Sequence, residues 1–138
     1  MESLEFKRAN DLPSMSNPPS KGGTIDPSPL LGTWHSTNKA TRGIIQLILS
    51  DQEGILTLQS FGASESSPID WGPVEGQAFA AGVGLAESVG FKATYDFGFL
   101  QTVVAAYLNK RILVVDTYNT FKDGSGRFNY FLRDHFYQ

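Results

Sequence analysis

From residue 31 onward, the sequence is a succession of short runs rich in β-branched and aromatic residues, and each run ends at turn-forming residues. Runs of this length and spacing are typical of β-strands joined by hairpins. We expect strands at 31–37, 43–50, 54–62, 69–80, 90–97, 99–108, 111–121 and 127–136. A meander of short strands closes most economically into a barrel, because closure leaves no unpaired edge. The sequence therefore predicts an all-β fold, a single up-and-down antiparallel β-barrel of about eight strands.

The connections between these runs carry the residues that tight turns require. Gly54 ends a short hairpin loop, and Asn109 and Lys110 separate two apolar runs. The segment 80–89 differs, because its glycines oppose a helix and it lacks the alternation of a strand. We interpret it as a long loop, a lid over the open end of the barrel, with a frayed and bulged strand as the alternative.

The first 30 residues differ in composition from the rest of the chain. From residue 10 to residue 29 they are dense in proline, serine, glycine and asparagine, which bury too little apolar area to offset the entropy lost on ordering. Because 138 residues suit one domain, we expect a barrel at 31–138 after an irregular N-terminal leader at 1–30. The leader is either flexible or a strap across one barrel end. The anchors of such a strap would be Leu4, Phe6, Leu12, Ile25 and Leu30.

The composition argues against several classes of function. Without cysteine the chain has no disulfide and no thiolate, and with only two histidines we expect no metal site and no cofactor. The net charge is -3 and the basic residues are dispersed, so we expect no nucleic-acid partner. The chain shows neither a secretory h-region nor a run of about 18 apolar residues, so we expect a cytoplasmic protein with no membrane span.

Alternation along the predicted strands gathers aromatic side chains on single faces. Tyr95 and Phe97 share one face of their strand, and Tyr130 shares a face with Phe136. Aromatic faces of this kind line small-molecule cavities and also build filled cores, and both outcomes stay open. In a cavity, Asp116 or Arg133 would orient a polar group of the ligand. The expected ligand-binding residues are Trp71, Tyr95, Phe97, Tyr118, Tyr130 and Arg133.

Several predicted strands are apolar on both faces, including the segments 44–49, 103–106 and 112–115. One face of a barrel strand lies inside, so the other needs a cover, which either the leader or a second copy of the protein could supply. Contiguous exposed apolar patches usually mark an interface, which favours the second copy. We therefore expect a homodimer.

Candidates for acid–base chemistry are few. Asp70, Asp96 and Asp116 interrupt apolar strands, where burial would raise the carboxyl pKa and permit general acid or base catalysis. The alternative is that each carboxylate is paired with a cation, a tyrosine hydroxyl or the backbone. His35 follows Trp34 directly and points to the opposite face of the strand, which favours a surface histidine over a catalytic one.

The tripeptide Gly32-Thr33-Trp34 opens the first predicted strand, and Arg133 lies on the last. In these features and in its meander spacing, the last three quarters of the chain resemble the lipocalin and calycin superfamily. The resemblance implies that Gly32 bends the strand, that Trp34 plugs the closed end of a barrel and that Arg133, or alternatively Arg127, packs across Trp34. The chain departs from the family pattern in lacking a Thr-Asp-Tyr motif in its expected loop, a helix after the barrel and a disulfide.

These observations lead to three hypotheses about function. The first is a barrel that binds a small hydrophobic or aromatic metabolite. The second is a cofactor-free cyclase or isomerase, in which the same aromatic cavity folds a hydrophobic biosynthetic intermediate into a reactive conformation. The third is a filled barrel that acts as an oligomerising interaction module through the faces at 44–48 and 113–115.

Overall fold

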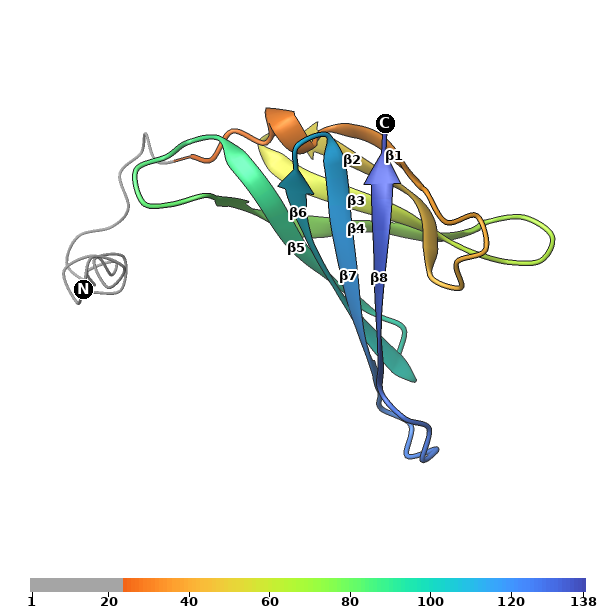
Figure 1. Ribbon diagram of the computed structural model, residues 1–138. Coiled ribbons are helices and arrows are strands. Elements are labelled where there is room, and N and C mark those ends of the chain that lie inside the picture. The colour runs from red at the N-terminus through yellow and green to blue at the C-terminus, as the bar shows by residue number, and fades with distance from the viewer. Residues whose placement is uncertain (1–23) are drawn as a thin grey trace, which may run out of the picture.

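The computed structural model describes residues 24–138, and in this part of the chain eight antiparallel strands close into one barrel (Figure 1). Strands that are neighbours in the barrel are also neighbours in the sequence, and β8 pairs with β1. The predicted all-β, up-and-down architecture is confirmed. The elements are the 3₁₀ turn η3 (Ser28–Leu30), β1 (Gly32–Ser36), β2 (Ile44–Gln52), β3 (Ile55–Gly62), β4 (Ile69–Ala80), β5 (Ser88–Asp96), β6 (Leu100–Asn109), β7 (Ile112–Phe121) and β8 (Tyr130–Tyr137). No helix among these elements has the length and apolarity to cross a bilayer.

The strand boundaries follow the predicted ones closely except at β8. This strand begins at Tyr130 rather than at residue 127, because the preceding loop is held by its own side chains. The Arg127 guanidinium donates to the Asp123 carboxylate at 2.7 Å and to the Ser125 hydroxyl at 3.0 Å. The same guanidinium lies 4.1 Å from the centroid of the Phe121 ring. These contacts keep Arg127 in the loop and out of the strand ladder.

The two ends of the barrel differ. The flared end carries the loops β1–β2, β3–β4, β5–β6 and β7–β8, and the closed end carries η3, the remaining hairpins and the C-terminus (Figure 1). At the flared end, two pairs of adjacent strands are not hydrogen-bonded to each other. β4 pairs with β5 only over residues 76–80, and β1 pairs with β8 only at His35 and Ser36. The two halves of the sheet therefore diverge at this end, as Figure 1 shows.

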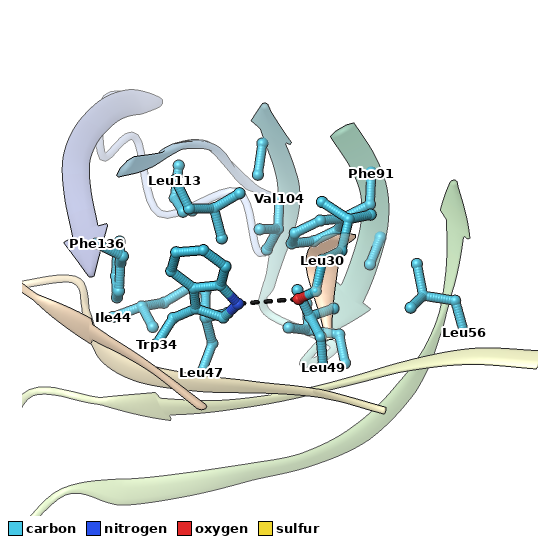
Figure 2. Packing of buried hydrophobic residues seen from close by; sticks show 14 of the residues in the cluster. Leu30, Trp34, Ile44, Leu47, Leu49, Leu56, Phe91, Val104, Leu113 and Phe136 are labelled. Atoms are coloured by element: carbon cyan, nitrogen blue, oxygen red, sulfur yellow. Dashed lines mark hydrogen bonds between the residues drawn. The ribbon is translucent and has the colours of Figure 1, made fainter. Parts of the chain in front are cut away.

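At the closed end, the Trp34 indole lies inside the barrel with only 2% of its surface exposed. Its Nε1–H donates to the Leu30 carbonyl at 2.9 Å, and the Leu30 side chain is itself fully buried (Figure 2). Gly32 begins β1 with a φ of 124°, a conformation that glycine adopts without a steric penalty. The turn into β1 thus brings Leu30 and Trp34 together as the plug of this end.

The hydrophobic core fills the closed half of the barrel (Figure 2). Leu47, Phe91, Val104 and Phe136 are buried around the plug. The core also contains Leu113 and its neighbour in alternation, Val115, with 0% and 2% exposure. The prediction that the segment 113–115 offers an assembly surface is therefore wrong for these two residues, since both point inward.

The described part of the leader runs along the closed end. The Asp26 backbone forms a bridge to the chain just before β5, with Asp26 N–H donating to the Ala86 carbonyl at 2.6 Å and Ser88 N–H donating to the Asp26 carbonyl at 3.0 Å. The loop at 81–87 is consequently joined to the leader at the closed end, and it is not a lid over the open end. Of the anchors expected for a strap, Leu4, Phe6 and Leu12 lie outside the described residues.

Candidate functional site

A cavity of 60 Å³ lies inside the barrel at the flared end. Side chains of β2, β4, β6, β7 and β8 converge on it, together with residues next to β2 and β5. Its lining consists of Arg42, Gly43, Ile44, Trp71, Phe97, Leu100, Thr102, Thr117, Asn119, Tyr130 and Leu132. Four larger hollows are open grooves at the surface: two at the closed end, of 360 and 600 Å³, one of 490 Å³ along β4 and β5, and one of 260 Å³ along β7 and β8. Of these hollows in residues 24–138, only the flared-end cavity combines an aromatic wall with inward-facing polar groups from several strands.

The wall is built around Trp71. Its ring centroid lies 5.4 Å from that of Tyr95 and 5.3 Å from that of Phe97, both in edge-on geometry, while Tyr95 and Phe97 are stacked at 5.6 Å. The Trp71 ring can lie here because residue 62 of β3 is a glycine, and a Cβ at that position would come within 2.6 Å of the Trp71 Nε1. Edge-on and stacked contacts of this kind favour a fixed arrangement of the rings. The wall is therefore a rigid apolar surface.

The floor of the cavity is polar. Thr102 Oγ1 donates to Asn119 Oδ1 at 2.7 Å, and Asn119 Nδ2 donates to Thr117 Oγ1 at 3.3 Å and to the Tyr130 carbonyl at 3.4 Å. Thr102, Thr117 and Asn119 are all buried, with 6% exposure or less. Sequence reasoning missed this group, although the alternation of β6 and β7 carries the signal. Thr102 shares a face with Val104, and Thr117 and Asn119 share the inward face of Val115.

The hydroxyl of Tyr95 is hydrogen-bonded to the protein backbone. Ser60 pairs with Leu47 of β2, but a register shift between β3 and β4 leaves it without a partner on β4. Tyr95 supplies one, since its Oη accepts from the Ser60 N–H at 2.9 Å and donates to the Gly72 carbonyl at 2.9 Å. Burial raises the pKa of the Tyr95 phenol, and the hydrogen bond with Ser60 opposes that shift. Tyr95 thus supports Trp71 from behind and has no free hydroxyl for a ligand.

In the described part of the chain, the rim of the cavity carries one charged side chain, Arg42 of the β1–β2 loop, which sequence reasoning did not identify. Within residues 24–138, no carboxylate lies within 4.0 Å of its guanidinium. Asp134 of β8 is nearby in the fold, but its carboxylate accepts a hydrogen bond from Thr41 Oγ1 at 2.7 Å and does not line the cavity. Loop residues have no periodicity, so the sequence alone gave no reason to place Arg42 here.

Three of the predicted residues lie on the outer face. Asp116 and Arg133 are directly opposite each other on β7 and β8, and the guanidinium binds the carboxylate through Nε at 2.7 Å and Nη2 at 2.9 Å. The hydrogen bonds that Arg133 donates to Asp116 raise the pKa of Arg133. Tyr118 is 49% exposed on the same face, with its ring 5.2 Å from that of Phe131. These residues do not line the cavity, and Arg133 does not cover Trp34, because their neighbours in alternation take the inward positions.

The other acid–base candidates also lie outside the cavity. The Gln59 amide donates to both oxygens of Asp70, and Lys122 Nζ lies 2.8 Å from the Asp96 carboxylate. These hydrogen bonds lower the pKa of each carboxyl, so neither is a proton donor near neutral pH. His35 is exposed, with its ring 5.7 Å from that of Tyr137. Within the described residues the cavity is lined by no carboxyl and no imidazole.

The predicted ligand-binding set therefore divides in two. Trp71, Phe97 and Tyr130 line the cavity and Tyr95 backs it, whereas Tyr118 and Arg133 lie outside. No cluster of three or more histidine, cysteine or acidic residues in residues 24–138 has the arrangement of a metal site. Comparisons of the chain with protein-family models, with curated proteins and with solved structures gave no match. The proposals below consequently rest on the chemistry of the cavity.

Proposed function

We propose that this protein is a barrel that binds a small, mainly apolar or aromatic molecule at the flared end. The observation that supports the proposal is the convergence of a rigid aromatic wall around Trp71 and a polar floor around Asn119 on one internal cavity. Apolar lining with a few oriented polar groups is what small-molecule sites have in common. The opposite end is filled by Trp34 and Leu30, so a ligand would enter the barrel from the flared end.

The volume of the cavity limits how the ligand binds. Sites for drug-sized molecules measure about 300–1,000 Å³, and an internal cavity of about 150 Å³ holds one benzene ring. At 60 Å³, the cavity has room for a small functional group only. The rest of the ligand would lie across the mouth, where Tyr130 of the lining is 44% exposed. The proposed mode is therefore end-on binding.

The two tryptophans of the chain allow a direct test. Trp71 lies at the proposed site and Trp34 lies at the filled end, so ligand binding is expected to change the fluorescence of Trp71 alone. We expect titration with 3-phenylpropan-1-ol to shift the emission of the wild-type protein, with an affinity of about millimolar for so small a probe. The matched control is Trp71→Phe, in which Trp34 remains as the reporter and no shift is expected. A response that survives in Trp71→Phe, or no response in the wild type, would contradict the proposal.

A second candidate function, assembly as a homodimer, is favoured by the outer surface of β6–β8. Four aromatic side chains there are each about half exposed, around the neutralised Asp116–Arg133 pair. They are Tyr107 (45%), Tyr118 (49%), Phe131 (47%) and Tyr137 (44%). Aromatic residues exposed together on one face of a sheet are enriched at interfaces. We propose a second copy of the chain as their cover.

Sedimentation velocity tests the dimer. We expect the wild-type protein to sediment as a dimer at micromolar concentration and Phe131→Lys to sediment as a monomer, because the lysine places an unpaired charge in the interface. The control is Phe99→Lys, which changes an exposed aromatic residue at the flared end and should leave the dimer intact. A wild-type protein that remains monomeric at high concentration would exclude this candidate.

A cofactor-free cyclase or isomerase stays a proposal, and the cavity limits the mechanism that such an enzyme could use. With no carboxyl and no imidazole in the described lining, it would have to act by confining the substrate rather than by acid–base catalysis. Membership of the lipocalin and calycin superfamily is likewise a proposal, supported by Gly32 and Trp34 at the start of the meander and weakened by the outward position of Arg133. The cytoplasmic location stays a prediction.

A further inference from the structure

The polar groups that line the cavity offer more hydrogen-bond donors than the protein accepts. Trp71 Nε1–H has no acceptor within residues 24–138, in contrast to Trp34 Nε1–H, which is bound to the Leu30 carbonyl. Thr117 Oγ1 accepts from Asn119, and its own hydrogen has no acceptor in the described chain. The Trp71 Nε1–H is open to solvent, since the buried side-chain polar atoms without a partner in residues 24–138 are Ser60 Oγ and Ser88 Oγ. A ligand that supplies an acceptor would therefore replace water at the Trp71 and Thr117 donors.

Arg42 adds positive charge to the same site. Among the described residues it is the one charged residue in the lining, and a guanidinium presents five N–H donors and no acceptor. Neither aspartate nor glutamate from residues 24–138 lines the cavity, and the neighbouring Asp134 already accepts from Thr41. Both the sign of the charge and the excess of donors thus favour an anionic acceptor.

The dimensions of the cavity agree with a carboxylate. A sphere of 60 Å³ is only about 5 Å across, so a group inside it lies close to every wall. A carboxylate consists of three heavy atoms and offers lone pairs on two oxygens. We propose, on the basis of the binding function proposed above, that the ligand is a small aromatic or alicyclic acid. Its carboxylate occupies the cavity near Arg42, Trp71 and Thr117, and its ring lies against the aromatic wall at the mouth.

Three probes that share one ring and one chain test this inference. They are 3-phenylpropanoate, 3-phenylpropan-1-ol and 3-phenylpropylamine, which present an anion, a neutral hydroxyl and a cation. Binding is followed by Trp71 emission, excited at the red edge of tryptophan absorption where the phenyl ring does not absorb. We expect the acid to bind about fivefold more tightly than the alcohol and the amine to bind most weakly. The advantage of the acid should shrink at high salt, because Arg42 is exposed.

Arg42→Gln is the decisive variant. We expect it to remove the advantage of the acid while the affinity for the alcohol changes by less than about twofold. Arg111→Gln is the matched control, since Arg111 is an exposed arginine at the closed end and in the described chain has no ion pair. Equal affinities for acid and alcohol, an unchanged preference in Arg42→Gln, or an equal loss in Arg111→Gln would each overturn the carboxylate assignment and leave the binding function standing. Failure of all three probes to change Trp71 emission would overturn both.

Discussion

Replacing Trp34 with alanine is expected to lower the free energy of unfolding by about 3–5 kcal/mol, the usual range for removing a large aromatic side chain from a close-packed core. The indole is 2% exposed and lies among Leu30, Leu47 and Phe136 (Figure 2). The loss is a large part of the total stability of about 5–15 kcal/mol that a domain of this size has. Urea denaturation monitored by circular dichroism measures it. Trp34→Phe serves as the matched variant, because it keeps an aromatic ring and removes only the hydrogen bond to Leu30.

Double-mutant cycles distinguish the observed closure of the barrel, in which Leu30 packs with Trp34, from the lipocalin-like closure, in which Arg133 would pack across Trp34. Because the Leu30 and Trp34 side chains are buried in the same core cluster, the losses in Trp34→Ala and Leu30→Ala should be non-additive. Arg133 lies on the outer face and binds Asp116, so the effects of Trp34→Ala and Arg133→Ala should simply add. Strong coupling of Trp34 to Arg133 would show that the arginine closes the barrel after all.

Replacing Tyr95 with phenylalanine is expected to cost about 2–4 kcal/mol, although it removes a single oxygen atom. That oxygen satisfies both the Ser60 N–H and the Gly72 carbonyl at the register shift between β3 and β4. Each buried backbone group left without a partner costs about 1–3 kcal/mol. Tyr118→Phe is the control, since Tyr118 is half exposed and makes no side-chain hydrogen bond within the described residues. A Tyr95→Phe protein as stable as Tyr118→Phe would contradict the structural role assigned to this hydroxyl.

The same residue predicts a loss of stability in alkali. In the unfolded chain tyrosine loses its proton near pH 10.0, whereas burial raises the pKa of Tyr95 in the folded protein. Above pH 10.0 the folded state therefore holds a proton that the unfolded state has lost, so stability falls as the pH rises through the folded pKa. Chemical denaturation at a series of alkaline pH values should show a steeper fall for the wild type than for Tyr95→Phe. Parallel curves would contradict the prediction.

The architecture was predictable from the sequence because each hairpin is encoded locally. Turn residues such as Gly54 and Asn109 separate runs of β-forming residues, and a meander of such runs has few ways to close. The face of a strand was predictable wherever only one face is strongly apolar, as in β5, where Tyr95 points inward and is followed on the same face by Phe97, just after the strand. The aromatic wall of the cavity follows from these two signals alone.

The alternation of apolar and polar residues did not predict which face of β7 lies inside the barrel. Leu113 and Val115 are as apolar as Ile112 and Val114, so Asp116 and Tyr118 were equally compatible with the interior. The pairing with β8 decides the matter, because Asp116 meets Arg133 across the outer ladder.

Two other features depend on tertiary contacts. The register shift at Ser60 determines that Tyr95 is structural, and the path of the β1–β2 loop brings Arg42 to the cavity. Neither leaves a periodic signal in the sequence.

The central claim, that a ligand binds inside the flared end, is tested most directly by a crystal structure of the protein soaked with 3-phenylpropan-1-ol. The prediction is that the hydroxyl lies within hydrogen-bonding distance of the floor formed by Thr102, Thr117 and Asn119, with the phenyl ring against Trp71 and Tyr130. Occupancy of the grooves at the closed end, or an interior occupied by ordered water alone, would contradict it.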